Sequence, residues 1–494
     1  MLSGPRWHVE QRGTILSKTH ETEALFGGVA LVSRQLLGMG LAVVGMLVST
    51  RVLGPHKYGQ FAIIVGLMTY AIKVGSLGLD VYLVRYQGDL KPPQFGVTQL
   101  IYLLAGSVML VFGIVLGPVA AFWYNDPSLR ELFWGYSFVP PMMLMNNAYM
   151  ALLERQMIYK KVALIESTGQ LLYLLISIPI VLHYHSVWGL IFGALGQSAL
   201  CLVASICISK MKFHPCWNWK EAKTQLNYGL GYVASSWIWE VRSLASPVVV
   251  GKLLGSEAVA FIALATKLIT MIGFAKFAIY RIYMSLLARL AVDRIKMKAA
   301  LETGLQLQVL VLGVSLISFM AVGPELIKNT MGAKWLPVFE IFPFIAIGQI
   351  VNGAFSLHSS ALYVIGKNRE VGLFHLIHVI VFIPAIWYLT TIFGNISGYG
   401  WAEVVALVSY PWIRHALRKD LFAIRERIIY INMLVAIAGI VLMSKLVDVE
   451  GPFWLRLMSC FLILSGLLLA VQQNRTTSAV ILNKIAGKLR HGTA

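Results

Sequence analysis

The Lys and Arg residues of this chain are concentrated on alternate connections between long apolar stretches. Of the 41 basic residues, 28 lie before the first stretch, in every second connection after it, or in the C-terminal segment. Five lie inside stretches, and the remaining eight lie in the opposite connections or at the stretch ends beside them. Basic residues of multi-span membrane proteins accumulate in cytoplasmic connections. The pattern therefore predicts an integral membrane protein with both termini in the cytoplasm.

Each apolar stretch is long enough to cross a membrane as a helix. Roughly 20 apolar residues, rising 1.5 Å each, span a hydrocarbon core of about 30 Å. We therefore expect an all-α membrane protein with about fourteen transmembrane helices. They cover residues 24–50, 61–80, 97–123, 132–153, 162–182, 187–209, 228–250, 258–280, 302–323, 337–364, 371–393, 396–413, 429–446 and 453–471.

The composition agrees with this class. Hydrophobic residues make up 58% and charged residues 13% of the chain, whereas soluble domains contain about 45–50% and 25%. A net charge of +19 would suggest nucleic-acid binding in a soluble protein. Here the excess lies on inner connections, beside anionic membrane lipids. We expect membrane lipids as partners and no nucleic acid.

Polar connections divide the predicted membrane part into two six-helix lobes and a pair of added helices. The predicted parts are a cytoplasmic N-terminal segment (1–23), a first six-helix lobe (24–209), a cytoplasmic linker (210–227), a second six-helix lobe (228–417), a basic linker (418–428), two added helices (429–472) and a cytoplasmic basic tail (473–494). Apolar and basic residues at 479–490 have a spacing that fits either an amphipathic helix on the inner membrane surface or a frayed tail.

The two lobes begin with similar turns. Residues 51–62 (RVLGPHKYGQFA) join the first two spans, and residues 252–263 (KLLGSEAVAFIA) join the seventh and eighth. Few positions are identical, but both segments hold the same place in the span order. A separation of six spans indicates a parallel repeat, which is one plan of membrane transporters. We expect Gly54 and Gly255 to permit a tight turn with positive φ.

Charged side chains inside the predicted spans are costly unless they face a cavity or a partner. Glu240 and Arg242 lie in the middle of the seventh span, and Lys267 lies in the middle of the eighth. These three either line a central cavity or form a structural ion pair. Arg34, in the first span, either faces the cavity or extends to the membrane interface.

Two further bases lie nearer the cytoplasmic ends of their spans. The long side chains of Lys73 and Lys276 can reach the interface from there, so they are either cavity or interfacial cations. Bases outnumber the acids that lie well inside the spans, which predicts a cationic cavity suited to an anionic cargo such as a phosphate. The candidate cavity cations are Arg34, Arg242, Lys267, Lys73 and Lys276.

Other residues suggest ion coupling and bending. Glu403, in the middle of the twelfth span, joins Glu240 as a candidate for ion uptake. Pro247 is the candidate hinge of the seventh span, because proline removes a backbone hydrogen bond and bends a helix. His375 and His378, one turn apart on the eleventh span, either titrate near neutral pH or form a polar pair between helices.

Enzyme signatures are missing from the sequence. It contains no GxxxxGK[ST] phosphate loop, and no Cys/His cluster has the spacing of a metal site. The connections are too short to hold a folded catalytic site. We therefore expect a transporter that needs no metal and no cofactor.

Several motifs, in register with the spans, resemble the Wzx-type flippases, the polysaccharide-transport branch of the multidrug/oligosaccharidyl-lipid/polysaccharide exporter superfamily. Residues 51–62 are similar to the family segment R-x-LGP-xx-YG-x-[FY]-A, and residues 78–85 (GLDVYLVR) are similar to GLD-xx-[LV]-VR. Further likeness lies at residues 122–129, 153–163 and 331–337. The resemblance covers roughly 24–471, and exopolysaccharide exporters of the colanic-acid type are the most similar subgroup.

This resemblance implies two six-helix lobes around a central cavity, with two added helices. It implies that undecaprenyl-diphosphate-linked oligosaccharides are moved across a bacterial inner membrane by alternating access, coupled to a proton or sodium gradient. Arg242 and Lys267, with Arg34, would hold the diphosphate or acidic sugars, and Glu240 or Glu403 would take up the ion. The polysaccharide polymerase and export or assembly proteins would be partners.

Two rival functions are compatible with a helical membrane protein. A drug antiporter of the same superfamily would usually have twelve spans and an acidic cavity for cationic drugs. A membrane polymerase or ligase for the same glycans would need a long outer loop to hold its site. The predicted spans, the surplus of internal bases and the short loops favour the flippase.

Overall fold

The chain folds into α-helices, with no strand in the described residues. The computed structural model describes residues 18–86, 88, 90–448 and 452–469; the side chains of 18–37, 232, 234–236, 448 and 467–469 are not described. The predicted tail helix at 479–490 lies outside the described residues. The first helices are α1 (Lys18–Gly75), α2 (Leu79–Arg85), α3 (Pro92–Tyr124), α4 (Ser128–Tyr136), α5 (Val139–Arg155), α6 (Tyr159–Tyr184) and α7 (Trp188–Ser209). The later helices are α8 (Trp219–Glu240), α9 (Gly251–Ile272), α10 (Phe274–Arg289), α11 (Arg294–Thr330), α12 (Val338–Val364), α13 (Asn368–Phe393), α14 (Ser397–Ala406), α15 (Tyr410–Asp420), α16 (Arg427–Asp448) and α17 (Phe453–Leu469).

Many of these helices have the length and composition of membrane spans. Within the described residues, nine are long and apolar enough to cross a membrane. This confirms the prediction of an all-helical, multi-pass membrane protein. The predicted total of fourteen remains a prediction, because span and helix do not correspond one to one. For example, α1 covers two predicted spans, whereas α4 and α5 share one.

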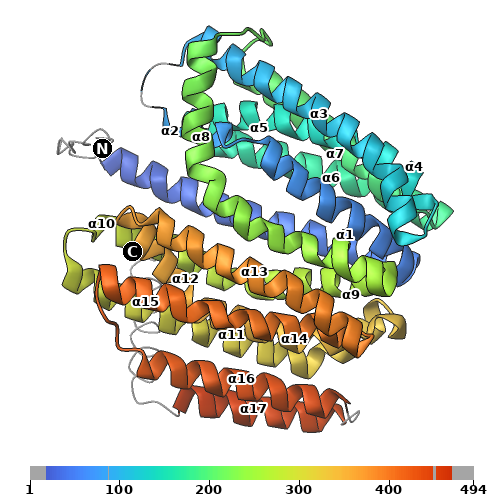
Figure 1. Cartoon of the computed structure of the whole chain (residues 1–494), viewed down its shortest axis with the longest axis vertical. Helices are drawn as coiled ribbons and strands as arrows, with labels where there is room; N and C mark the ends of the chain where they lie inside the picture. The colour runs from blue at the N-terminus through green and yellow to red at the C-terminus, as the bar shows by residue number, and fades with distance from the viewer. Residues whose placement is uncertain (1–17, 87, 89, 449–451, 470–494) are drawn as a thin grey trace.

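The helices are arranged in two groups (Figure 1). Helices α1–α7 make up the first group, α9–α15 make up the second, and α16 and α17 lie at the far side of the second. Helix α8 joins them, since it packs against α2 in the first group and against α13 in the second. The largest buried apolar cluster lies almost wholly in the second group, around residues such as Trp335, Phe342 and Phe382.

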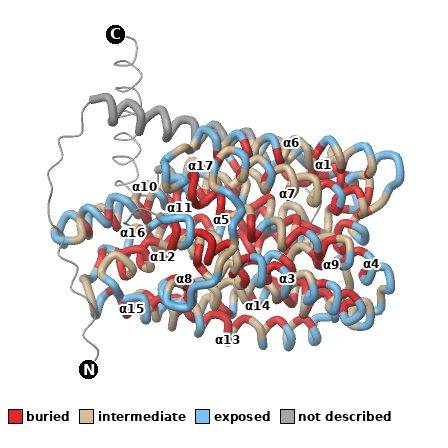
Figure 2. Tube along the Cα trace, turned by 90° about the horizontal axis from the view of Figure 1, so that it is seen from above, coloured by how far each residue is buried: buried red, intermediate tan, exposed pale blue. Residues whose placement is uncertain are grey.

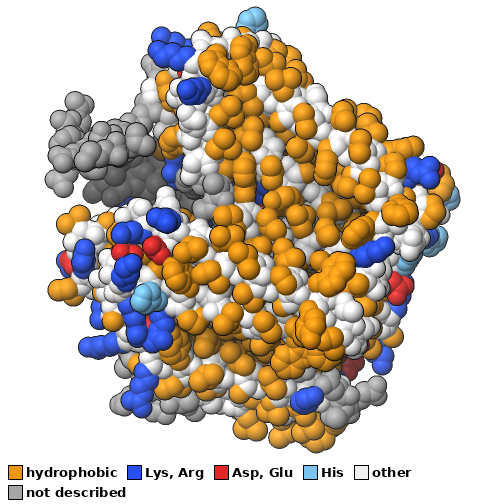
Figure 3. Space-filling view, in the orientation of Figure 1, with side chains coloured by type: hydrophobic (Ala, Val, Ile, Leu, Met, Phe, Trp, Pro, Cys, Tyr) orange, Lys and Arg blue, Asp and Glu red, His pale blue; other side chains and the backbone are white. Residues whose placement is uncertain are grey.

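Apolar side chains also cover much of the outside. Figure 2 shows that the outer turns of many helices are exposed, and Figure 3 shows hydrophobic side chains over most of the face in view. On α3, for example, Val108, Val111 and Val115 are each more than half exposed. Exposed apolar surface on this scale is expected of helices that contact lipid rather than water.

The two predicted glycine turns are present. The backbone of α1 bends at Gly54, with φ 75° and ψ 174°, and α9 bends at Gly255, with φ 82° and ψ −178°. Only glycine adopts this conformation readily. We call the end of the molecule that contains both bends the glycine-turn end, and the opposite end, with residues 210–218 and 421–426, the linker end.

Hydrogen bonds join the two groups at the glycine-turn end. The Arg51 guanidinium donates to the carbonyls of Asn329 (3.1 Å) and Thr330 (3.0 Å). In return, the Lys334 ammonium donates to the Arg51 carbonyl at 3.0 Å. The Lys252 ammonium donates to the Trp123 carbonyl at 2.8 Å. Basic side chains therefore cap carbonyls of the opposite group.

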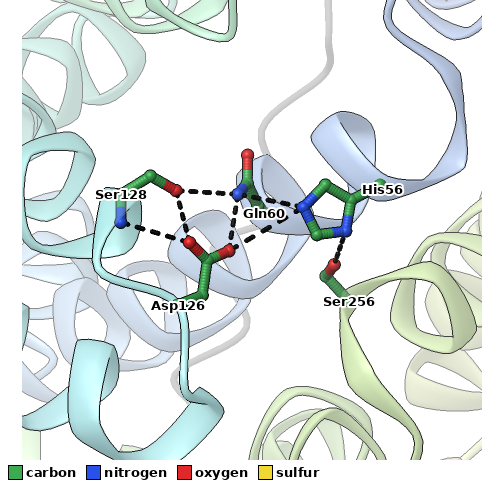
Figure 4. Close-up of polar contacts among 5 residues, drawn as sticks. All are labelled: His56, Gln60, Asp126, Ser128 and Ser256. Carbon is green, nitrogen blue, oxygen red and sulfur yellow. Dashed lines mark hydrogen bonds and ion pairs between the residues drawn. The ribbon is translucent and has the colours of Figure 1, made fainter.

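A polar network lies at the same end (Figure 4). The Gln60 amide donates to Asp126 Oδ2 at 2.6 Å, and the Ser128 hydroxyl donates to Asp126 Oδ1 at 2.6 Å. His56 Nδ1 lies 2.9 Å from Ser256 Oγ, which belongs to the other group. Partial burial raises the pKa of Asp126, but hydrogen bonds from Ser128 and Gln60 outweigh it and hold this pKa below its usual value.

The seventh predicted span is broken around Pro247. Helix α8 is followed by a 3₁₀ turn, η1 (Val241–Leu244), and a π turn, η2 (Ser246–Val250). The Tyr124 hydroxyl donates to the Pro247 carbonyl at 2.7 Å, and Trp123 Nε1 donates to the Val248 carbonyl at 3.2 Å. A broken helix in a membrane needs such donors, because lipid offers none. The predicted break is present, and its working as a hinge remains a prediction.

Candidate functional site

Three adjoining cavities lie among the charged residues predicted from the sequence. The Lys267 cavity, of about 220 Å³, is lined by first-group residues and by Lys267 of α9. The Arg242 cavity, of about 370 Å³, shares Lys267 with it. The Lys276 cavity, of about 350 Å³, shares Arg242 and Glu403 with the Arg242 cavity. The cavities thus form a continuous row from the first group into the second.

Arg242 and Glu403 form an ion pair in the wall between two of these cavities. One guanidinium nitrogen of Arg242, on η1, donates to both carboxylate oxygens of Glu403, on α14. Glu403 is 2% exposed. The guanidinium also lies over the Phe382 ring, 5.0 Å from its centroid. Because a buried charge is costly without a partner, the pairing offsets the cost of burying both side chains.

Lys73 and Glu240 form a second ion pair. The Lys73 ammonium, in the last turn of α1, lies 2.5 Å from a carboxylate oxygen of Glu240, at the end of α8. Both side chains are partly exposed, and Trp237 Nε1 donates to the Lys73 carbonyl at 3.2 Å. Both predicted ion-coupling acids are therefore paired with predicted cavity cations.

Lys267 has no such acid. Its half-buried side chain lines the Lys267 cavity and the Arg242 cavity. In the part of the chain that the structure describes, its ammonium forms no ion pair. Tyr58, Tyr173 and Gln170 line the same space from the first group. Lys267 thus lies between the two groups, and no carboxylate among the described residues pairs with it.

Lys276 is buried rather than extended to the interface. It is 5% exposed, and its ammonium donates to the side-chain oxygens of Gln349, at 3.1 Å, and Asn352. The Asn352 amide in turn donates to the Tyr410 hydroxyl at 3.1 Å. Its acceptors are neutral amide oxygens, so Lys276 is a second lysine without a carboxylate partner among the described residues, here within the second group.

The side chain of Arg34 lies outside the described residues. Of the four other predicted cations, Lys73 and Arg242 are paired with carboxylates, whereas Lys267 and Lys276 are not. The described cavities therefore contain two lysines without a carboxylate partner among the described residues. Sequence reasoning identified these residues, but it left open whether Arg242 and Lys267 line a cavity or form an ion pair, and whether Lys73 and Lys276 line a cavity or reach the interface.

His378 is a site residue that the sequence left undecided. Its Nδ1 lies 2.9 Å from Ser409 Oγ, and that hydroxyl donates to the Ala406 carbonyl at 2.8 Å. Because the hydroxyl has one proton, His378 Nδ1 must carry the proton of their shared hydrogen bond. Nε2 is then a free acceptor in neutral His378. His375, its predicted partner, lines the same Lys276 cavity. The residue that holds His378, Ser409, gave no signal in the sequence.

A helical membrane fold with two groups of helices and a row of charged cavities is typical of membrane transporters. The chain belongs to the family described as polysaccharide biosynthesis protein, whose sequence pattern matches residues 48–340. It is also 19% identical, over 374 residues, to an uncharacterized membrane protein in the cps region of Klebsiella pneumoniae, covering 75% of this chain and 76% of that protein. These matches confirm the resemblance to Wzx-type flippases of the exporter superfamily.

Solved structures of two transporters share the fold. Lipid II flippase MurJ, in an inward closed conformation, matches with a TM-score of 0.66 and 12% identity, covering 94% of this chain and all of that one. An inward-facing multidrug resistance MATE family transporter of the MOP superfamily matches with a TM-score of 0.59 and 14% identity, covering 79% of this chain and 99% of that one. At these identities the likeness concerns the fold alone.

Proposed function

We propose that this chain is a flippase that moves undecaprenyl-diphosphate-linked oligosaccharide repeat units across the bacterial inner membrane. The units would serve the synthesis of exopolysaccharide or another surface polysaccharide. Membership of a polysaccharide biosynthesis family supports this proposal. The relative in the cps region and the fold shared with a lipid II flippase support it further.

The proposal depends on Lys267 and Lys276, the two cavity lysines without a carboxylate partner among the described residues. A lipid-linked diphosphate bears two negative charges, and its lipid tail can remain in the bilayer while the headgroup crosses. Lys267 lines two cavities between the groups of helices, so it is placed to meet the diphosphate first. An ammonium in a cavity of low dielectric attracts phosphate strongly. The same charges would repel the cationic drugs that a drug antiporter carries.

The orientation follows from the basic residues. The linker end is proposed to face the cytoplasm with both termini, because its connections hold most of the Lys and Arg. The glycine-turn end would then face outward. The contacts from Arg51, Lys252 and Lys334 keep that end shut, which suits a state open to the cytoplasm.

Alternating access would then require the two groups, as six-helix lobes, to rock apart at the glycine-turn end. The broken segment at Pro247 is the proposed hinge. A proton or sodium gradient is the proposed driving force. Glu240 or Glu403 can take up a cation only after separating from Lys73 or Arg242. Released repeat units would pass to the polysaccharide polymerase and its export or assembly proteins.

The proposal is tested in a deletion strain complemented with wild-type, K267Q or K73Q protein. We expect the deletion to abolish surface polymer and to trap complete undecaprenol-linked repeat units on the cytoplasmic face. K267Q should export at least about tenfold less polymer than K73Q at equal protein level, because Lys73 is already neutralised. Normal polymer without trapped intermediates in the deletion strain would contradict the function.

A further inference from the structure

The Lys276 cavity has a composition that the diphosphate does not explain. Its walls come from the second group of helices, from Trp239 at the end of α8 and from Arg242 on η1, and Lys267 does not line it. Its lining includes the aromatic side chains of Trp239, Tyr280 and Phe374, the amides of Gln349 and Asn352, and the hydroxyl of Ser356. Aromatic faces combined with amides and hydroxyls, in about 350 Å³, are within the range of small-molecule sites.

Lys276 is the lysine of this cavity, and no carboxylate among the described residues pairs with it, because Glu403 is bound to Arg242. Its ammonium has three N–H donors, and the described residues provide two acceptors, Gln349 and Asn352. One donor therefore remains for an anion. A metal cation is disfavoured here, because the carboxylate that lines the cavity is already bound to Arg242.

Two buried polar atoms in the cavity wall are left without partners among the described residues. One is Arg242 Nε, which is a donor. The other is His378 Nε2, which the Ser409 hydrogen bond leaves as an acceptor. Unpartnered buried polar atoms are rare and costly. A ligand that completes this wall must therefore both accept and donate hydrogen bonds.

We propose that the Lys276 cavity binds an acidic sugar of the glycan cargo, a hexuronic acid or a sugar with a comparable carboxylate. The carboxylate would accept from Lys276 and from Arg242 Nε, and a ring hydroxyl would donate to His378 Nε2. The lipid-linked diphosphate is esterified at both phosphorus atoms and carries no proton at neutral pH, so it would leave His378 unmatched. The inference rests on the proposed function, since it assigns the sugar part of that cargo to this cavity and the diphosphate to Lys267.

Binding to the purified full-length protein in detergent tests the proposal. The probes are methyl glucuronide, its neutral counterpart methyl glucoside, and inorganic diphosphate. Quenching of tryptophan fluorescence, with Trp239 in the cavity wall, and calorimetry report binding. We expect glucuronide to bind at least about tenfold tighter than glucoside, a difference that a single charge-assisted hydrogen bond can supply.

Three variants distinguish sugar binding in the Lys276 cavity from binding elsewhere in the site. K276Q should lose most of the preference for glucuronide, and K267Q should keep it. H378N keeps a donor for Ser409 but lacks Nε2, so it should weaken the binding of glucuronide and of glucoside by a similar factor. If K276Q does not fold, H378N together with the wild-type comparison of the probes still decides the question.

Other outcomes would overturn the assignment. Equal binding of both sugars would exclude an acid-specific site, and Lys276-dependent binding of diphosphate in preference to glucuronide would make it a phosphate site. A neutral glycan on the undecaprenol-linked units that accumulate in the deletion strain would also overturn it. That last result leaves the flippase function standing, whereas the absence of any trapped unit would remove the function itself.

Discussion

Gly54 and Gly255 share one backbone conformation at equivalent points of the two groups of helices. Their φ and ψ values are 75° and 174°, and 82° and −178°. Few positions of the two turns are identical, and their shared place in the span order identified the pair. The two turns also meet: a Cβ on Gly59 would lie 1.9 Å from the Ser256 carbonyl oxygen. The turn after the first predicted span and the turn after the seventh therefore contact each other at the glycine-turn end.

The first prediction concerns the backbone at Gly255. Its Cβ position is surrounded by open space, so Gly255→Ala adds no clash and tests the conformation alone. An L-residue in this region of φ and ψ costs about 1–3 kcal/mol. We expect a clear loss of thermal stability in detergent. Gly231→Ala, at an equally open position inside a helix, should be neutral or stabilising; equal effects would contradict the role of the turn.

The second prediction concerns the close approach at Gly59. Because a Cβ there would collide with the backbone of the other group, Gly59→Ala should separate the groups at the glycine-turn end. The measurement is the labelling of a cysteine placed at Ser256, with a membrane-impermeant maleimide added from outside. We expect labelling to increase several-fold in G59A/S256C relative to S256C alone. Unchanged labelling would mean that the contact does not keep this end shut.

The third prediction concerns Arg242 and Glu403. Removing one partner of a buried pair leaves an uncompensated charge, at a cost of about 3–5 kcal/mol. Glu403→Gln should therefore be strongly destabilising, and Arg242→Gln combined with Glu403→Gln should recover much of the loss. Thermal unfolding of the two single variants and the double variant provides the test. Additive losses would show that the two side chains are not coupled.

The fourth prediction concerns pH. The pKa of Asp126 is lowered in the folded protein by the bonds from Ser128 and Gln60. A lowered folded pKa gives stability that is present above the unfolded value of about 3.9 and is lost as the pH falls through the folded value. Wild-type stability should therefore decline more steeply than that of D126N below about pH 4. Parallel pH profiles of thermal unfolding would contradict this contribution.

The helices and their charged residues could be predicted, because hydropathy and the cost of charge in lipid act locally along the chain. The conformation of Gly54 and Gly255 was predicted because positive φ in a tight turn is a local preference of glycine. Which charges pair could not be predicted. Lys73 meets Glu240, and Arg242 meets Glu403, only through the packing of helices that are distant in sequence.

Lys276 shows most clearly which contacts could not be predicted from the sequence. Its place near the end of a predicted span allowed a side chain that reaches the interface. Gln349 and Asn352 on α12 instead hold its ammonium inside the second group. Two neutral amides in an apolar helix carry no sequence signal for a lysine partner. Likewise, Ser409 fixes the proton on His378 from a 3₁₀ turn that hydropathy cannot locate.

The most direct test of the function is transfer of the cargo by the purified protein. Undecaprenyl-diphosphate-linked repeat units from the deletion strain are placed in the inner leaflet of proteoliposomes, and their appearance outside is followed by an impermeant glycan-modifying enzyme. We expect wild-type protein to transfer the lipid, and K267Q to transfer it at least about tenfold more slowly, which corresponds to roughly 1.4 kcal/mol. No transfer by folded wild-type protein, in the presence of either a proton or a sodium gradient, would contradict the flippase assignment.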